Sequence, residues 1–355
     1  MRADPPKVVP FMRAIVYSRP GDSSVLELVD REITEPGPGE VRVRIVVSGV
    51  NPTDWKSRTG SSSVTSEPTL TVPNQDGSGV IDAVGAGVTS FAPGDRVWLG
   101  ISGWQRPTGG TAQEYTIALA SRVFPLPDAA DFDLGASLGV PAVTAHRVLT
   151  VGELLPNRLA KGSLTGRHVL VAGGAGAVGH AAIQLARWAG ATVITTVSAP
   201  AKAALARDAG AHHVINYRDA DVVEQIRAIA PDGVDHVVEV AASANSALDL
   251  AVVKPLATIA SYANDGGGPV TVDVGASMRL NVRYQWVLIY TMGADAWQAA
   301  GEDIVAALKD AALPVGVGAG MPLHRFPLEQ TAAAHDAVEG DVIGKVLIDV
   351  APELR

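Results

Sequence analysis

The first 140 residues of the chain are divided into short β-like segments by glycine and proline. Residues 41–47 alternate apolar and polar side chains at first and end fully apolar, which is typical of a strand with a buried face. Similar segments at 77–85 and 94–99 continue the series, and a turn at 35–40 precedes it. Frequent short strands separated by glycine and proline predict a small barrel-like β domain.

From about Leu138 the pattern changes to an alternation of strands and helices. Such an alternation is typical of an α/β fold with a doubly wound parallel sheet. The residues from Met321 onward, with 344–349, return to β character and are expected to rejoin the first domain. The predicted strands are 169–172, 191–197, 213–217, 234–240, 257–262 and the aromatic segment 284–290. The predicted helices are 140–149, one that opens after the strand at 169–172 and continues over 181–189, 201–209, 221–229 and 244–251.

Three glycines follow the strand at 169–172 in the pattern Gly174-x-Gly176-x-x-Gly179. The first glycine permits a tight turn, the second lets the backbone approach a pyrophosphate, and the third lets the helix pack close to the strand. The phosphates then lie on free N–H groups at the helix N-terminus. A turn that binds nothing is the alternative, but the strand before, the helix after and the next strand at βαβ distance favour a dinucleotide.

The residues that follow the predicted strand at 191–197 indicate which dinucleotide binds. An NAD site usually has an acidic residue here to bind the ribose 2′-hydroxyl, whereas this strand is followed by Ser198 and Lys202 and has no carboxylate. A hydroxyl and an ammonium bind a 2′-phosphate, so NADPH is favoured over NADH. Tyr217 could join the same pocket, and a solvated helix residue is the alternative interpretation of Lys202.

Composition and charge exclude several classes of protein. A chain of 355 residues is long for one hydrophobic core, so two domains are expected. The net charge of −9 argues against nucleic acid or a membrane surface as the main partner, and no apolar run is long enough to span a bilayer. The absence of cysteine excludes disulfides, thiol catalysis and thiolate metal sites. With no targeting signal visible, the cytoplasm is the expected location.

Several segments, taken together in order and spacing, resemble the zinc-independent quinone oxidoreductase (zeta-crystallin-like) branch of the medium-chain dehydrogenase/reductase superfamily. The resemblance implies a GroES-like β-barrel catalytic domain, a Rossmann domain, NADPH as cofactor, and hydride transfer to quinones or to the C=C bond of conjugated carbonyls. It also implies a homodimer, or a tetramer, joined through the nucleotide domains. The segments that carry it are 49–56, 76–80, 91–97, 109–115, 141–146, the glycine turn, 209–217 and 344–346.

The resulting domain prediction has three parts. Residues 1–11 are expected to be a flexible extension, residues 12–138 with 318–355 the GroES-like catalytic domain, and residues 139–317 the Rossmann domain. Carried over by matching position, the cofactor contacts fall into three groups. They are Gly174, Gly176, Ala177, Val178 and Gly179 at the pyrophosphate; Ser198, Lys202 and Tyr217 at the 2′-phosphate; and Thr144, Asn245, Tyr262 and Ala263 elsewhere, mostly on the nicotinamide side. A helix N-cap is the alternative for Asn245.

Asn51, Asp54 and Lys56 are the candidate catalytic residues. Asn51 is expected to position the substrate or the nicotinamide ribose, and Asp54 to orient its neighbours. Turn chemistry is the alternative for both, because Asn-Pro and Asp favour turns. Lys56 is a hypothetical hydrogen-bond donor to the carbonyl of an enone, where it would stabilise a developing enolate.

The zinc-containing branch of the superfamily differs at the positions of its metal ligands. That branch has a cysteine where this chain has Asn51 and a histidine where it has Gln75. Without these ligands, no metal site is expected. The leading hypothesis is therefore a zinc-independent NADPH-dependent quinone oxidoreductase. The alternatives are an enoyl or enone reductase in a biosynthetic pathway and, in another class, a catalytically silent NADPH-binding structural or regulatory protein. The expected partner is a small quinone or enone, with no nucleic acid and no membrane.

Overall fold

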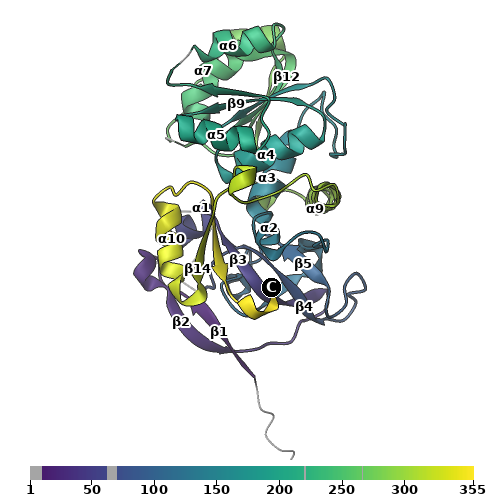
Figure 1. Ribbon diagram of the computed structural model, residues 1–355, viewed down its shortest axis with the longest axis vertical. Coiled ribbons are helices and arrows are strands. Elements are labelled where there is room, and N and C mark those ends of the chain that lie inside the picture. The colour runs from purple at the N-terminus through teal and green to yellow at the C-terminus, as the bar shows by residue number, and fades with distance from the viewer. Residues whose placement is uncertain (1–9, 62–69, 220, 266) are drawn as a thin grey trace, which may run out of the picture. The chain divides into compact units, whose positions relative to one another are not determined.

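The computed structural model describes residues 10–61, 70–219, 221–265 and 267–355, which form two compact units (Figure 1). One unit contains the chain up to Gly139 with His324–Val342 and Val346–Arg355, and the other contains Val140–Leu323 with Ile343–Lys345. After the domains that the sequence predicts, we call them the catalytic unit and the nucleotide unit. The α/β fold class, with a GroES-like domain and a Rossmann domain, is confirmed.

The boundaries between the units differ in detail from the predicted ones. The second division falls after Leu323 instead of residue 317, because the residues before it contact the nucleotide unit. The His180 ring, for example, lies 2.7 Å from the carbonyl oxygen of Ala319. At the N-terminus, residues 1–9 of the predicted extension lie outside the described residues. Phe11, placed in that extension, pairs with Glu32 as the first residue of a strand.

The catalytic unit is built on a seven-stranded sheet with the order β14-β15-β3-β4-β5-β7, in which β6 also pairs with β3. A two-stranded sheet of β1 and β2 accompanies it. The strands are β1 Phe11–Val16, β2 Glu27–Glu32, β3 Glu40–Val50, β4 Asp76–Val84, β5 Arg96–Leu99, β6 Tyr115–Leu119, β7 Val123–Pro125, β14 Leu323–Pro327 and β15 Lys345–Asp349. The helices are α1 Pro52–Arg58, α2 Phe132–Ala136 and α10 Thr331–Glu339.

Two bulges curl this sheet. The register between β3 and β4 shifts between Arg42 and Val43 and again between Ile45 and Val47. Bulges of this kind increase the local twist and bend a strand, which brings sheet faces together around a core. At Gly79 the strands approach so closely that a Cβ atom would lie 2.0 Å from the carbonyl oxygen of Arg44. A glycine is therefore required at this point of the barrel-like sheet.

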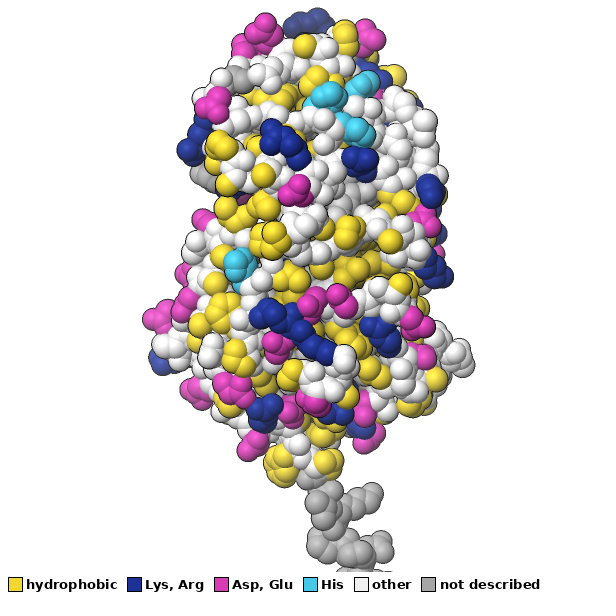
Figure 2. Space-filling view, viewed as in Figure 1, with side chains coloured by type: hydrophobic (Ala, Val, Ile, Leu, Met, Phe, Trp, Pro, Cys, Tyr) yellow, Lys and Arg dark blue, Asp and Glu magenta, His cyan; other side chains and the backbone are white. Residues whose placement is uncertain are grey.

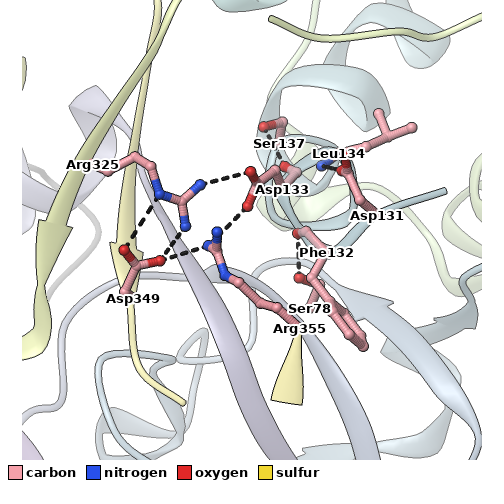
Figure 3. Close-up of polar contacts among 9 residues, drawn as sticks. All are labelled: Ser78, Asp131, Phe132, Asp133, Leu134, Ser137, Arg325, Asp349 and Arg355. Atoms are coloured by element: carbon pink, nitrogen blue, oxygen red, sulfur yellow. Dashed lines mark hydrogen bonds and ion pairs between the residues drawn. The ribbon is translucent and has the colours of Figure 1, made fainter. Parts of the chain in front are cut away.

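A ring of four charged side chains links the C-terminal strands to α2 (Figure 3). Arg325 on β14 binds Asp133 on α2 at 2.6 Å, and Arg355 binds the same carboxylate at 2.9 Å. Both arginines also bind Asp349 at the end of β15. Each carboxylate thus faces two guanidinium groups, so the ring is an ion-pair network in place of an isolated surface pair. It fixes the last part of the chain to a helix that lies about 200 residues earlier in the sequence.

The nucleotide unit contains a parallel six-stranded sheet with the order β10-β9-β8-β11-β12-β13. Numbered from β8, this order is 3-2-1-4-5-6, the order of a dinucleotide-binding Rossmann fold. Its strands are β8 His168–Ala172, β9 Thr192–Val197, β10 His213–Asn216, β11 Val234–Glu239, β12 Val253–Ser261 and β13 Arg283–Trp286. Its helices are α3 Gly139–Leu149, whose first residue still belongs to the catalytic unit, α4 Ala177–Trp188, α5 Pro200–Asp208, α6 Val222–Ile229, α7 Ala242–Val252, α8 Val274–Leu280 and α9 Ala294–Lys309.

Sequence reasoning missed two helices of this unit, α8 and α9. The helix that it expected to open in the glycine turn and to continue over residues 181–189 is α4. The helix starts at Ala177 because Gly176 adopts an extended N-cap conformation immediately before it. This start places the last glycine of the motif inside the first helical turn, where the free N–H groups are.

On the face in Figure 2, acidic and basic side chains are interspersed, without a broad patch of one sign on either unit. Within the described residues, no helix is long and apolar enough to cross a membrane.

Candidate functional site

The glycine turn between β8 and α4 has the geometry of a phosphate cradle. A Cβ atom on Gly174 would lie 2.2 Å from Oγ1 of Thr195, and one on Gly179 would lie 2.3 Å from the carbonyl oxygen of Gly173. Both positions therefore need glycine for packing inside the protein. At Gly176, by contrast, the nearest atom to an added Cβ would be 3.5 Å away. Here the protein itself leaves room, which is the space that a ligand approaching the backbone would use.

The start of α4 provides donors for that ligand. Gly176 is the N-cap residue and has no side chain with which to cap the helix. The first N–H groups of a helix have no partner within the helix, so those of Ala177 and Val178 point out of its N-terminal end. The positive end of the helix dipole lies at the same place. The residues present therefore fit a pyrophosphate group.

The candidate 2′-phosphate residues lie at the carboxyl edge of β9 and β10. Asn216 pairs with Val197, and the backbone N–H of Tyr217 donates to the Val197 carbonyl at 3.1 Å. Ser198 and Tyr217 are thus brought to one edge of the sheet, where the Tyr217 side chain is 51% exposed. Lys202 is half-buried in the first turn of α5, shortly after Ser198. The assignment of these three residues to NADPH remains a prediction.

Tyr262 and Ala263 follow the last residue of β12 and line a cavity of about 400 Å³. Burial, reinforced by the nearby carboxylates of Asp265 and Glu239, raises the pKa of Tyr262, so its phenol stays protonated. Thr144 is buried on α3, and it is Arg147, one turn later, that lines the cavity.

Asn245 is a helix residue, and the alternative that it caps the helix is wrong. The N-cap of α7 is Ala241, because the helix begins at Ala242. The Asn245 amide nitrogen donates to Oε1 of Glu239 at 3.0 Å, and the backbone N–H of Ala241 donates to the same oxygen. A cofactor contact by Asn245 stays a prediction, but its side chain is oriented by the carboxylate at the end of β11.

Sequence reasoning missed a pair of buried carboxyl groups beneath this edge. Glu239 is fully buried and Asp249, on α7, is 1% exposed. Neither oxygen of Asp249 receives a hydrogen bond from a described residue, and the same holds for Oε2 of Glu239. The Asp249 and Glu239 side chains interact with each other. Two ionised carboxylates cannot hydrogen-bond each other, so one of the two groups must hold a proton. Burial and the Glu239 charge raise the pKa of Asp249 well above its ordinary value. Glu239, next to the end of the buried strand predicted at 234–240, was the available signal.

In the catalytic unit, Asn51 and Asp54 form the N-terminal cap of α1. The carboxylate of Asp54 accepts from the backbone N–H of Asn51 at 2.7 Å, and the Asn51 side chain caps the helix in return. The Asn51 amide nitrogen also donates to Oδ2 of Asp76 at 2.7 Å. The turn-chemistry alternative thus describes contacts that the structure contains. A role in positioning substrate remains a prediction.

Asp76 is the start of a buried polar chain that sequence reasoning did not identify. Its carbonyl oxygen accepts from Thr111 at 2.6 Å, and Thr111 contacts Ser48 at 2.7 Å. Ser48 accepts from the Asn74 amide at 3.0 Å, and His335 lies 2.9 Å from the Asn74 oxygen. Burial lowers the pKa of His335 to about 3, so this histidine is neutral and acts as a fixed hydrogen-bonding group. The chain holds the strand ends around Asn51 rigidly.

Lys56 lies apart from these buried groups. It is exposed on α1, with its ammonium 5.6 Å from the centre of the Trp55 ring. The structure does not bring Lys56 into the hydrogen-bonded set of Asn51, Asp54 and Asp76. The proton-donor role of Lys56 therefore stays a hypothesis.

The residues at the zinc-ligand positions do not fit a zinc ion. Asn51 is engaged with Asp76, and Gln75 offers one buried amide oxygen that accepts no hydrogen bond from a described residue. Within the described ranges, no group of three or more His, Asp or Glu side chains could hold a metal. We therefore assign no chemistry to a metal ion.

Comparisons with known proteins identify the class. A family model described as alcohol dehydrogenase GroES-like domain matches residues 37–128, and one described as zinc-binding dehydrogenase matches residues 177–308. The chain belongs to the medium-chain dehydrogenase/reductase superfamily and is an oxidoreductase, as the sequence resemblance predicts. Among its relatives, quinone oxidoreductase from Rattus norvegicus is 30% identical over 95% of this chain and 98% of that protein.

Two further relatives bear on the chemistry. A 2-haloacrylate reductase from Burkholderia sp is 31% identical over 95% of this chain and 98% of that protein. A mycobacterial protein solved in complex with NADPH is 26% identical, with a TM-score of 0.77 over 95% of this chain and 99% of that one.

Proposed function

We propose that this protein is a zinc-independent NADPH-dependent oxidoreductase that transfers hydride from NADPH to a quinone. The observation that carries the proposal is the glycine turn, where Gly176 leaves space and α4 presents free N–H groups. The quinone oxidoreductase relatives and the NADPH complex of the mycobacterial relative support it.

The chain's own residues have defined tasks in this proposal. The turn of Gly174, Gly176 and Gly179, with Ala177 and Val178, binds the pyrophosphate. Ser198, Lys202 and Tyr217 bind the 2′-phosphate, and Tyr262 and Ala263 lie beside the nicotinamide. NADPH supplies the hydride; the acceptor gains it with one proton from water, so the protein needs chiefly to orient the reactants.

Reduction of a conjugated C=C bond is the second candidate function. The 2-haloacrylate reductase from Burkholderia favours it, because that relative is as similar as the quinone oxidoreductases. Quinones and enones share an electron-poor carbon conjugated to a carbonyl. For an enone, a donor to the carbonyl oxygen stabilises the developing enolate. Asn51 and Asp54 are proposed to position the acceptor, and Lys56 to donate.

The test of function is NADPH oxidation against a panel of quinones and α,β-unsaturated carbonyls, with NADH as control. Turnover of quinones alone supports the first candidate, and turnover of enones alone supports the second. Tight NADPH binding with no consumption across the panel would instead favour a catalytically silent NADPH-binding protein.

Replacing Lys202 by glutamate is expected to reverse the cofactor preference. The carboxylate would repel the 2′-phosphate and could accept a hydrogen bond from the ribose hydroxyl of NADH. We expect kcat/KM for NADPH to fall about 100-fold, which corresponds to about 2.8 kcal/mol, with little loss for NADH. An unchanged preference would remove Lys202 from the 2′-phosphate site.

We also propose a cytoplasmic homodimer formed through the nucleotide units. Among the described strands, β13 pairs only with β12, so it is an edge strand. Its last residue, Trp286, and the following Leu288 are 56% and 49% exposed. An unpaired edge with apolar side chains is suited to strand pairing with a second copy. Sedimentation velocity is expected to give the mass of a dimer, and a monomer at all concentrations would contradict this.

A further inference from the structure

A cavity of about 400 Å³ lies at the carboxyl ends of β12 and β13 in the nucleotide unit. This volume is in the range of small-molecule sites. The cavity is lined by the last residues of both strands and by the segments that follow them. The lining residues are Arg147, Ser261, Tyr262, Ala263, Asn264, Gln285, Trp286, Val287, Leu288, Thr291 and Met292.

Arg147 is the one ionised side chain among these lining residues of the described chain. It projects from α3 and is half-buried. Its guanidinium forms no ion pair with any acidic side chain in the described ranges. The neighbouring carboxylate of Asp303, on α9, already has other partners. It binds Arg158 at 2.6 Å and faces His146 at 2.8 Å. The positive charge at the cavity is therefore not neutralised by the protein.

The rest of the wall is neutral and divides into two kinds of surface. Ser261, Gln285 and Thr291 supply polar groups, whereas Trp286 and Leu288 supply apolar surface. A single guanidinium beside an aromatic wall suits a small planar molecule with one anionic group. Its fork of donors matches the two oxygens of a carboxylate. One cation without a helix N-terminus or a second basic residue favours a monoanion over a phosphate.

We propose that Arg147 binds a carboxylate on the hydride acceptor, so that the substrates of this protein are conjugated carboxylic acids. This inference rests on the proposed function, in its C=C-reducing form, because Tyr262 and Ala263 at the same cavity are the proposed nicotinamide neighbours. Arg147 orients the acid, and the carbon β to the carboxylate receives the hydride while water supplies the proton to the α carbon.

The kinetic test compares an acid with its ester. Crotonate and methyl crotonate carry the same C=C bond and differ in charge. For Arg147→Met we expect KM for crotonate to rise at least about 30-fold, which corresponds to about 2 kcal/mol, with the KM of the ester within about twofold. Arg207→Met removes an exposed arginine from α5 of the same unit and serves as the matched control.

A binding test separates this inference from the proposed reduction. Butyrate has the same carboxylate but no C=C bond, and its affinity is measured by calorimetry with and without NADP⁺. We expect Arg147→Met to weaken butyrate binding at least about tenfold and Arg207→Met to leave it unchanged. Arg147→Lys, which keeps the charge but loses the paired donors, is expected to lie between native protein and Arg147→Met.

The outcomes decide separately between the carboxylate site at Arg147 and the proposed reduction. Equal affinities for butyrate in native protein and Arg147→Met overturn the carboxylate site. A parallel rise of KM for acid and ester also overturns it, since that result shows a structural role. Arg147-dependent butyrate binding without reduction of any acceptor supports the carboxylate site and overturns the proposed reduction.

Discussion

A Gly176→Val variant is expected to fold normally and to bind NADPH about 100-fold more weakly than the native protein. The reason is the space at this residue: the nearest protein atom to an added Cβ lies 3.5 Å away. The backbone of Gly176, with φ of −79° and ψ of 161°, is also accessible to valine. Changing the N-cap from glycine to valine costs about 1 kcal/mol at most. The added methyl groups therefore interfere with a ligand at the N-terminus of α4, while the fold is left nearly unchanged.

Gly179→Ala provides the matched comparison. An added Cβ would lie 2.3 Å from the carbonyl oxygen of Gly173, so α4 must move away from β8. Overpacking of this kind costs about 1–3 kcal/mol, and we expect a lower melting temperature with or without cofactor. Thermal unfolding and fluorescence titration with NADPH distinguish the two variants. If Gly176→Val bound NADPH as tightly as the native protein, the pyrophosphate would not lie against this turn.

Replacing Asp249 by asparagine is expected to stabilise the protein at alkaline pH and to have little effect at acidic pH. In the native protein, Asp249 and Glu239 interact, and no described residue donates a hydrogen bond to either oxygen of Asp249 or to Oε2 of Glu239. At high pH these buried oxygens lose the shared proton, and an unsatisfied buried polar group costs about 1–3 kcal/mol. An asparagine side chain supplies an N–H to Glu239 at every pH, so the variant should gain about this amount once the pH exceeds the raised pKa of Asp249.

The direction of this pH dependence of stability follows from the protons that the folded and unfolded states bind. Burial and the Glu239 charge raise the pKa of Asp249 above that of the unfolded chain, so the folded state binds a proton that the unfolded state has released. Native stability from this group is complete below the ordinary aspartate pKa and is lost as pH rises through the raised value. Urea unfolding at several pH values measures the difference. Asp232→Asn, at an exposed site in the same unit, is the control. A gain that did not depend on pH would refute the shared proton.

The sequence carries the large features of this fold because they depend on local patterns. The glycine spacing after an apolar strand predicts the turn, and alternation of strands and helices predicts the parallel sheet. The order 3-2-1-4-5-6 places the turn at the point where the strand order reverses, where ligands bind in such sheets. These features depend on short segments and on the order in which the segments follow one another along the chain.

Contacts between side chains on different elements could not be predicted in this way. Glu239 and Asp249 meet only because α7 packs back on β11, and the Arg147 cavity depends on where β12 and β13 end. The predicted aromatic strand at 284–290 stops at Trp286, because a 3₁₀ turn over Ile289–Thr291 follows it. Asn51 and Asp54 illustrate the remaining difficulty, since the same residue types serve helix capping and substrate binding equally well.

The C-terminal strands have a consequence for the order of events during synthesis on the ribosome. β15 pairs with β3, so the catalytic sheet joins residues separated by about 300 positions. The ring of Arg325, Asp133, Asp349 and Arg355 also forms only after Arg355 has been made. The strands of the nucleotide sheet, in contrast, all lie within Val140–Leu323. Domains generally fold as units while the chain emerges. The nucleotide unit can therefore fold while the barrel-like sheet still lacks β14 and β15, so this sheet is completed only after residues 323–349 have been made.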